Sequence, residues 1–333
     1  MSSAETMLAA RYATSGPDAG TLEVVELPRP RPGPGEVLVR LAVAGVNPTD
    51  WKSRRGGGTA SGFDTVVPGQ DGAGEIAAVG EGVDPSRIGE RVWVYEAQWQ
   101  RAQGTAAEWI ALRADLAVPL PDGISLDQGA GLGIPALTAH RCLFADGAID
   151  GTAVLVHGGA GAVGHAAIEL ARHAGARVAA TVSTGEKARL AAAAGAEPVV
   201  DYRHEDVAAA VRAWAPVGVA RVVDVDLVSN LAVDTAVLAP NGVIAGYAIS
   251  RDPIVLGRDL MVLNAVLRPV LVYTMPDEAK HAAVHAITAA LRDRALSELP
   301  VTRFPLRQIT AAHDAVENGA VGKVLVDLPH EAG

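Results

Sequence analysis

The first third of the chain consists of short apolar runs separated by glycine and proline. Residues 37–43 form an apolar run rich in β-branched side chains, with Arg40 inside it, and this predicts a strand. Proline alternates with arginine and glycine over residues 28–35, which excludes a helix there. Similar apolar runs predict strands at residues 74–79, 91–95 and 108–112. Short strands at this spacing predict a compact, barrel-like β domain.

The pattern changes near Gly151, where apolar strands begin to alternate with amphipathic helical segments. Strands are predicted at residues 153–156, 177–182, 198–200, 221–225, 243–247 and 270–273. Helices are predicted between them, at residues 165–174, 185–194, 205–214 and 230–238. This alternation predicts an α/β fold with a doubly wound parallel sheet, because parallel neighbours require crossover connections.

The length of 333 residues allows two domains, since a single core rarely grows past about 250–300 residues. We expect a β-rich domain over residues 1–126 and a dinucleotide-binding domain over residues 127–270. A predicted helix at residues 278–291 and a strand at residues 323–327 follow, and we expect residues 271–333 to return to the first domain. The parallel-sheet domain is then nested inside the β-rich one.

A glycine-rich motif follows the predicted strand at residues 153–156. Gly159, Gly161 and Gly164 make the pattern G-x-G-x-x-G between that strand and an amphipathic helix. The first glycine allows a tight turn, the second lets a pyrophosphate approach the backbone, and the third lets the helix pack on the strand. The N-terminus of the helix attracts phosphate through free N–H groups and its dipole. We therefore expect a dinucleotide, and not merely a glycine-rich turn, at Gly159, Ala160, Gly161, Ala162, Val163 and Gly164.

The end of the next strand distinguishes the two nicotinamide cofactors. An NAD site usually places Asp or Glu there, about 20 residues on, to hold the ribose hydroxyls. Ser183 and Thr184 stand there instead, followed by Lys187, and this set suits the 2′-phosphate of NADPH. Glu186 favours NAD, since it could reach the ribose, and we expect Arg189 on a solvated helix face. We predict NADPH as the cofactor.

Charge and composition exclude several classes of protein. The formal net charge of −10 argues against a nucleic-acid binder. The single cysteine, Cys142, excludes an internal disulfide and a four-cysteine structural zinc site. Residues 1–16 lack the pattern of a secretory signal, and the apolar residues 260–273 are too few to span a bilayer. We expect a cytoplasmic protein that binds neither nucleic acid nor membrane.

Further motifs extend along most of the chain. They are Gly45-Val46-Asn47-Pro48-Thr49-Asp50, Val67-Pro68-Gly69-Gln70-Asp71-Gly72-Ala73-Gly74, Gly133-Ile134-Pro135-Ala136-Leu137-Thr138-Ala139-His140, the glycine-rich motif with the preceding Val156-His157-Gly158, Ala312-His313 and Gly322-Lys323-Val324. In this order they resemble the medium-chain dehydrogenase/reductase superfamily, and within it the zinc-free quinone oxidoreductases of the zeta-crystallin type. The resemblance implies a β-rich GroES-like barrel domain, split by a nested Rossmann domain that binds NADPH.

The same resemblance implies roles for individual residues. It implies cofactor contacts by Asn47 and Thr138 near the nicotinamide and by Lys187 and Tyr202 near the adenosine phosphate. Tyr247 and Lys323 are further cofactor-binding candidates, and Tyr247 departs from the family, since small glycine or serine residues are common at its position. From the residues alone, Asn47 with Pro48 is equally consistent with a turn, Thr138 with a helix cap, and Tyr202 with a rim position.

The ligands of a catalytic zinc ion are missing. Zinc-dependent relatives carry a cysteine in the loop that holds Asn47 and a His-Glu pair at the position of Gln70 and Asp71. A catalytic zinc ion usually has three His, Cys or carboxylate ligands. We therefore expect no metal.

The chain departs from the family just after Asp50. Many quinone reductases carry a tyrosine near the substrate at this point, whereas this chain has Trp51 and Lys52. We take Asn47 and Lys52 as candidate catalytic donors, because reduction of a carbonyl-conjugated acceptor creates an oxyanion. In the alternative, Lys52 faces water and water protonates the product.

The function that we predict is hydride transfer from NADPH to a quinone or an activated carbon–carbon double bond. One alternative is an enoyl-thioester reductase of the polyketide or fatty-acid type, with Arg54 and Arg55 as its basic entrance. Another is a catalytically silent NADPH-binding sensor or structural protein. We also expect a homodimer through the edge of the Rossmann domain, because residues 254–273 are strongly apolar for an edge strand.

Overall fold

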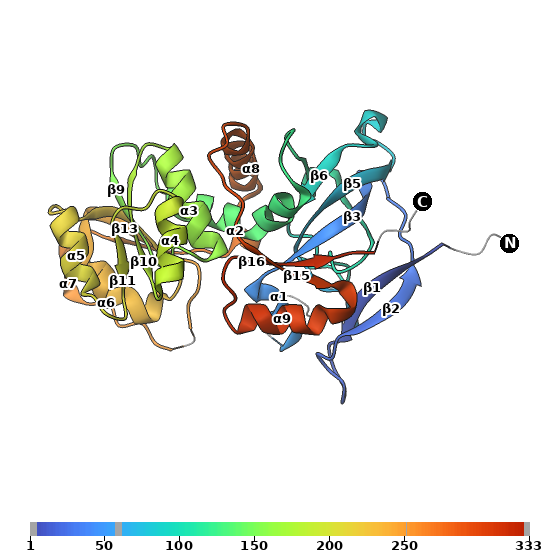
Figure 1. The fold of residues 1–333 in the computed structure, drawn as a ribbon, viewed down its shortest axis with the longest axis horizontal. Helices are drawn as coiled ribbons and strands as arrows, with labels where there is room; N and C mark the ends of the chain where they lie inside the picture. Colours follow the sequence, from blue (N-terminus) through green and yellow to red (C-terminus); the bar gives the residue numbers. More distant parts are fainter. Residues whose placement is uncertain (1–4, 57–61, 251, 330–333) are drawn as a thin grey trace. The chain divides into compact units, whose positions relative to one another are not determined.

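The computed structural model describes residues 5–56, 62–250 and 252–329, and these divide into two units (Figure 1). Unit 1 contains the described chain up to Ile134 and from Glu298 onward. Unit 2 is Pro135–Ser297. Helix α2 (Leu126–Phe144) carries the chain from the first unit into the second.

Unit 1 is built on a mainly antiparallel sheet with the order β15-β16-β3-β5-β6-β8, in which β7 also pairs with β3. These strands are β3 (Glu36–Val46), β5 (Asp71–Val79), β6 (Arg91–Val94), β7 (Trp109–Arg113), β8 (Ala117–Pro119), β15 (Val301–Pro305) and β16 (Lys323–Asp327). A smaller sheet has the order β2-β1-β4, formed by β1 (Thr6–Ala13), β2 (Glu23–Pro28) and β4 (Thr65–Val66). Alternate residues of β3, such as Val37, Val39 and Leu41, lie in the core between these elements. The predicted β-rich domain is confirmed.

Short helices complete unit 1. They are α1 (Pro48–Arg54), α9 (Ile309–Glu317), and the 3₁₀ turns η1 (Pro85–Arg87), η2 (Ala114–Leu116) and η4 (Leu306–Gln308). Helix α1 begins directly after β3 because Pro48 occupies its first position, where a proline ring costs no hydrogen bond. Helix α9 packs against α1.

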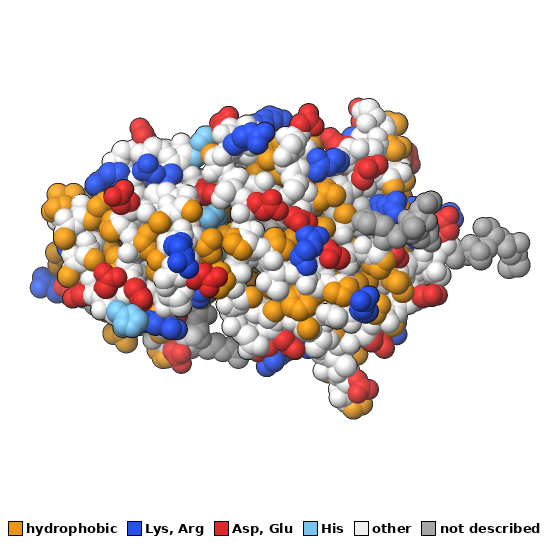
Figure 2. All heavy atoms as spheres, viewed as in Figure 1, with side chains coloured by type: hydrophobic (Ala, Val, Ile, Leu, Met, Phe, Trp, Pro, Cys, Tyr) orange, Lys and Arg blue, Asp and Glu red, His pale blue; other side chains and the backbone are white. Residues whose placement is uncertain are grey.

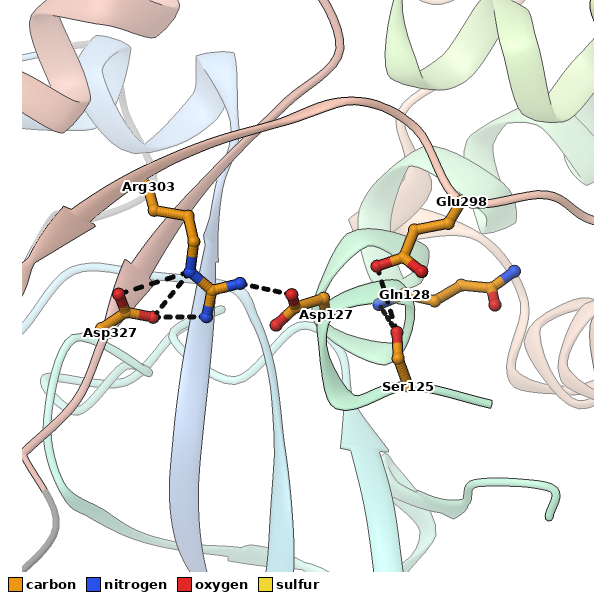
Figure 3. Close-up of polar contacts among 6 residues, drawn as sticks. All are labelled: Ser125, Asp127, Gln128, Glu298, Arg303 and Asp327. Carbon is orange, nitrogen blue, oxygen red and sulfur yellow. Dashed lines mark hydrogen bonds and ion pairs between the residues drawn. The ribbon is translucent and has the colours of Figure 1, made fainter. Parts of the chain in front are cut away.

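Polar contacts tie the last strands of unit 1 to the start of α2 (Figure 3). Arg303 of β15 forms ion pairs with Asp127 in the first turn of α2 and with Asp327 of β16. Ser125 caps the helix by accepting a hydrogen bond from the amide of Gln128 at 2.9 Å, and its hydroxyl lies 3.1 Å from Glu298. These contacts restrain strand β16, which begins at Lys323.

Unit 2 is a parallel sheet with helices packed on it. Its strand order is β11-β10-β9-β12-β13-β14, and every neighbouring pair is parallel. The strands are β9 (Ala153–Val156), β10 (Arg177–Val182), β11 (Val199–Asp201), β12 (Val219–Asp224), β13 (Leu238–Gly246) and β14 (Val266–Pro269). The strand order reverses direction at β9, as in a Rossmann fold, and this confirms the predicted doubly wound sheet.

In the part of unit 2 that the structure describes, six helices follow α2, and four of them pack in two pairs. The six helices are α3 (Ala162–His173), α4 (Gly185–Ala193), α5 (Val207–Trp214), α6 (Leu227–Val237), α7 (Arg258–Val262) and α8 (Asp277–Arg292), with a 3₁₀ turn η3 (Val272–Thr274). Helix α3 packs against α4, and α5 packs against α6. Because parallel crossovers are right-handed, the reversal at β9 places these two pairs on opposite faces of the sheet.

The structure departs from the sequence prediction near the end of unit 2. A strand was expected at residues 270–273 and a return to the first domain at residue 271. The edge strand β14 instead ends at Pro269, and Val272 begins a 3₁₀ turn. Helix α8 packs against α3, and the chain leaves unit 2 only after Ser297. The units also divide at Ile134 and Pro135, inside α2, rather than at residue 126.

Figure 2 shows acidic and basic side chains interspersed with apolar atoms over one face. Among the described residues, no helix combines the length and apolar character needed to cross a bilayer.

Candidate functional site

The glycine-rich turn of unit 2 joins the carboxyl end of β9 to the start of α3. Each glycine of the motif has a different steric environment. A Cβ added to Gly164 would lie 2.3 Å from the carbonyl oxygen of Gly158, and one added to Gly159 would lie 2.9 Å from the Cβ of Ala180. A Cβ added to Gly161 would meet only the Gly158 carbonyl oxygen, at 3.4 Å, which is an ordinary contact. The first and third glycines are therefore required by packing, whereas Gly161 faces open space.

This open space lies at the N-terminus of α3, for which Gly161 is the N-cap. The amides of the first turn of a helix, here beginning with Ala162 and Val163, have no acceptors within the helix. Together with the helix dipole they favour a negatively charged group. The turn therefore has the geometry that a pyrophosphate requires.

The other nucleotide candidates of unit 2 lie at the same edge of the sheet. Ser183 is buried at the end of β10, and Thr184 caps α4 by accepting a hydrogen bond from the amide of Lys187 at 3.3 Å. Tyr202 follows β11, and its amide donates to the carbonyl oxygen of Val182 at 3.1 Å. Because β9, β10 and β11 are parallel neighbours, their carboxyl ends meet at one edge.

The side chains at this edge differ in exposure. Tyr202 is 53% exposed, and Lys187 is half-buried. Tyr247 directly follows β13 and is also half-buried, and burial raises the pKa of its hydroxyl. Thr138 is buried in the part of α2 that belongs to unit 2.

A second group of candidates is found in unit 1, around Asn47. Strands β3 and β16 pair in antiparallel register with Val46 opposite Val324, which brings Asn47 beside Lys323. The Lys323 ammonium donates to Oδ1 of Asn47 at 2.8 Å, and Nδ2 of Asn47 donates to Oδ2 of Asp71 at 2.6 Å. Nζ of Lys323 lies 3.7 Å from the same carboxylate oxygen of Asp71. All three side chains are buried.

The carboxyl of Asp71 is held from two sides. Its Oδ1 accepts a hydrogen bond from the amide of Ile134 at 2.9 Å, and the Cβ of any residue replacing Gly133 would lie 2.0 Å from that oxygen. Burial raises the pKa of Asp71, and the nearby charge of Lys323 lowers it. Burial lowers the pKa of Lys323, and Asp71 raises it. Because both carboxyl oxygens of Asp71 accept hydrogen bonds, the ionised pair fits this geometry.

Asp50 is a further buried acid next to Asn47. Its Oδ2 accepts a hydrogen bond from the Asn47 amide at 2.7 Å, while its Oδ1 is buried without a partner among the described residues. Burial raises the pKa of Asp50 to about 7, and the Asp71 carboxylate also raises it. Sequence reasoning did not single out Asp50 or Asp71 as site residues. Both acids could have been predicted as candidates, because each lies in a family motif from which a zinc ligand is missing.

Lys52 does not join this group. Its side chain is exposed, and Nζ lies 5.6 Å from the centre of the Trp51 ring. The neighbouring arginines are engaged with α9, since Arg54 lies 3.6 Å from Asp314 and Arg55 lies 2.7 Å from Glu317. Within the described residues, the predicted basic entrance is therefore paired with acids.

Where zinc-dependent relatives have the first residue of their His-Glu pair, this chain has Gln70, whose side chain is hydrogen-bonded to Gln98. The buried Gln70 donates to Oε1 of Gln98 at 3.0 Å and accepts from the amide of Gln98 at 3.2 Å. Among the described residues, no three His, Cys, Asp or Glu side chains gather in a way that could hold a metal ion.

Family models match both units. The model for the alcohol dehydrogenase GroES-like domain matches residues 33–122, and the model for zinc-binding dehydrogenase matches residues 162–289. The quinone oxidoreductase of Lama guanicoe is 31% identical over 307 residues, which are 90% of this chain and 91% of that protein. The quinone oxidoreductase of Homo sapiens is 29% identical, with the same 90% and 91% coverage.

Solved structures agree with these relatives. The native structure of a mycobacterial quinone oxidoreductase has a TM-score of 0.82 at 30% identity, over 97% of this chain and 100% of that chain. The quinone oxidoreductase of Thermus thermophilus, also solved in complex with NADPH, has a TM-score of 0.81 at 29% identity, with the same coverage of 97% and 100%. This chain therefore belongs to the medium-chain dehydrogenase/reductase superfamily, as a member of its quinone oxidoreductase type.

Proposed function

We propose that this chain is an NADPH-dependent reductase that transfers hydride to a quinone or to an activated carbon–carbon double bond. The observation that carries the proposal is the glycine-rich turn in unit 2, where Gly161 leaves open space at the N-terminus of α3. The Thermus thermophilus relative, whose structure includes an NADPH complex, supports the same cofactor here.

In this proposal unit 2 is the nucleotide-binding domain and unit 1 is the catalytic domain. The turn from Gly159 to Gly164 holds the pyrophosphate. Ser183, Thr184, Lys187 and Tyr202 hold the 2′-phosphate, because no acid stands at the end of β10 and a lysine follows. For the nicotinamide end of the cofactor, the candidates are Thr138 and Tyr247 in unit 2 and Asn47 in unit 1, as the family resemblance implies for Asn47 and Thr138.

NADPH, when bound, supplies the hydride. Hydride addition to a quinone or enone creates an oxyanion, which donors fixed in advance stabilise. The Asn47 amide group has two N–H donors, and Asp71 accepts from Nδ2. The second N–H is the donor that we assign to the oxyanion. Lys323 acts through Asn47 rather than on the cofactor, because its ammonium is buried against Oδ1 of Asn47.

Water supplies the final proton in this mechanism. The exposure of Lys52 supports this assignment over a lysine donor. The pairing of Arg54 and Arg55 with acids of α9 favours a small free acceptor over an enoyl thioester with a long anionic arm.

The test is an NADPH-oxidation screen against quinones, enones and enoyl thioesters, run with and without a chelator. We expect turnover with quinones or enones, unchanged by the chelator. Turnover with thioesters alone supports the enoyl-thioester reductase instead. Tight NADPH binding without turnover of any acceptor indicates a sensor or structural protein, and loss of activity on chelation contradicts the metal-free mechanism.

A further inference from the structure

A buried histidine stands at the head of the glycine-rich turn. His157 directly follows β9 and is 4% exposed. Its Nδ1 lies 3.0 Å from Oγ1 of Thr181, and its Nε2 lies 2.8 Å from Oδ1 of Asp234. Thr181 lies on β10 and Asp234 on α6, so the ring connects three elements below the turn.

Thr181 also contacts the turn through the backbone. Its hydroxyl oxygen accepts a hydrogen bond from the amide of Gly158 at 3.3 Å, and its carbonyl oxygen accepts one from the amide of Gly159 at 3.0 Å. The amide of His157 donates to the carbonyl oxygen of Val223 at 2.9 Å. The first residues of the turn are therefore held from the strands on both sides of β9.

A second buried acid, Asp224, lies at the end of β12. Oδ1 of Asp224 accepts from the amide of Asp226 and from Nδ2 of Asn230, both at 2.8 Å. Among the described residues, Oδ2 of Asp224 and Oδ2 of Asp234 are both buried without a hydrogen-bond partner. The Asp224 side chain is among the causes that raise the pKa of Asp234, and two buried carboxyls that interact in this way can share one proton.

Several titratable groups interact with this pair of acids. Burial is the largest cause that raises the pKa of Asp234, to about 7, the His157 ring lowers it, and the Asp224 charge raises it. Asp224 also raises the pKa of Cys142 and that of Tyr247. Burial raises the pKa of Cys142 to about 12 and raises that of Tyr247 as well, so both stay neutral near pH 7.

We propose that His157, Thr181 and Asp234 are positioning residues, which hold the glycine-rich turn in its nucleotide-binding shape through hydrogen bonds that include one proton shared by Asp234 and Asp224. The role in nucleotide binding rests on the proposed function. A turn that is already in its bound shape loses less conformational freedom when NADPH binds. The hydrogen-bond directions are consistent: Thr181 donates to Nδ1, Nε2 donates to Asp234, and protonated Asp234 donates to Asp224.

The variant Asp234→Asn tests the shared proton. Its amide oxygen can accept from His157 and its NH₂ group can donate to Asp224, so it copies the protonated acid. We expect NADPH affinity at neutral pH within about threefold of wild type. Asp234→Leu and Thr181→Val each remove one link, and we expect them to raise the Kd for NADPH by about 10–150-fold, while kcat at saturating NADPH stays within about threefold.

The pH dependence of stability separates this role from simple packing. In the folded state the pKa of Asp234 is about 7, above the ordinary value of 3.8 that describes the unfolded chain. Between these values the folded protein keeps a proton that the unfolded chain releases, so stability falls as pH rises through this window and levels off above about 7. Asp234→Asn lacks this proton. The melting temperature of Asp234→Asn minus that of wild type therefore rises with pH up to neutrality. Asp50 is present in both proteins, so its titration does not contribute to this difference.

The experiment measures melting temperatures of the nucleotide-free protein between about pH 5 and pH 9, and the Kd for NADPH at each pH. The control is Asp277→Asn, an exposed acid of the same unit, whose melting curve should run parallel to wild type. Parallel curves for Asp234→Asn, or unchanged Kd in Thr181→Val, would overturn the proposal. Should Asp234→Leu fail to fold, the other two variants decide. A wild type that does not bind NADPH refutes the proposed function alone, since the melting curves need no nucleotide.

Discussion

The Asn47 side chain has chemically opposite neighbours, and these determine which way its amide is turned. Lys323 can only donate to it, so Oδ1 faces the ammonium, and the Asp71 carboxylate accepts from Nδ2. The reverse orientation would place an N–H group against the ammonium and an oxygen against the carboxylate. The orientation of a single amide thus follows from a buried ion pair.

This arrangement predicts different outcomes for two variants of the same loop. Asn47→Ala removes the proposed oxyanion donor, and we expect kcat to fall by about 10²–10³-fold. Lys52→Met alters an exposed side chain, and we expect activity near that of wild type. If Lys52 were the proton donor, that variant would lose about 10²–10⁴-fold in kcat instead. Steady-state kinetics with an accepted substrate, together with melting temperatures that verify folding, make the comparison.

Cofactor preference is also decided by single residues. Lys187 is half-buried, its amide donates to the Thr184 cap, and we propose that its ammonium binds the 2′-phosphate. We expect Lys187→Ala to raise the Kd for NADPH by about 10–150-fold and to leave the Kd for NADH unchanged, because a charge-assisted contact contributes about 1.5–3 kcal/mol. Arg189→Ala, an exposed position of the same helix, is the control. Equal affinity of wild type for the two cofactors would contradict the assignment.

At the scale of elements, the glycines in the turn between β9 and α3 differ in their steric surroundings. Gly164 and Gly159 are in close contact with protein atoms, whereas Gly161 is not. The same short motif therefore contains positions required by packing and a position, Gly161, that we propose receives the ligand. The distinction is invisible in the motif itself, because all three residues are glycine.

Alanine substitutions should separate these roles. In Gly164→Ala the new Cβ would lie 2.3 Å from a backbone oxygen, and we expect a loss of about 1–3 kcal/mol in the free energy of unfolding. Gly161→Ala should melt like wild type but bind NADPH at least about tenfold more weakly. The control is Gly257→Ala, since Gly257 is also a helix N-cap, with φ −79° against −75° for Gly161, and nothing lies within 4 Å of its added Cβ. Weaker NADPH binding in Gly257→Ala would remove the distinction.

For the molecule as a whole, the edge of the unit 2 sheet is the feature that suggests assembly. β14 is the last strand in the order, and α7 precedes it. Apolar side chains are exposed along this segment, with Val255 at 83%, Met261 at 71% and Val262 at 69%. An unpaired edge flanked by exposed apolar residues is stabilised when a second copy covers it.

We therefore predict a homodimer through this edge. Light scattering should give twice the mass of the chain for wild type, and a mass close to that of one chain for the double variant Val255→Glu with Met261→Glu. The control is Val217→Glu, which places the same charge at an isolated position that is 80% exposed. A wild type that scatters as a single chain at working concentration would contradict the prediction, as would a double variant that remains dimeric.

The sequence by itself determined the features that depend on near neighbours. These features are the order of strands and helices in unit 2, the glycine-rich turn and the absence of an acid after β10. Each of them depends on a pattern of residues that are close together in the sequence. The cap at Thr184 and the start of α1 at Pro48 are local for the same reason. Helix α8 was predicted as a helix but assigned to the wrong part of the chain, because an apolar face does not specify its partner.

Only the tertiary structure decided which distant side chains meet. Lys323 and Asn47 are 276 positions apart, and His157 and Asp234 are 77 positions apart. The first contact depends on the register of β3 with β16, and the second on the packing of α6 against β12 and β13. The exposure of Lys52 was likewise open in the sequence, since a lysine beside a tryptophan can face either water or a site. Sheet register and helix packing are set by the whole core, and so these contacts have no signature within any short stretch of sequence.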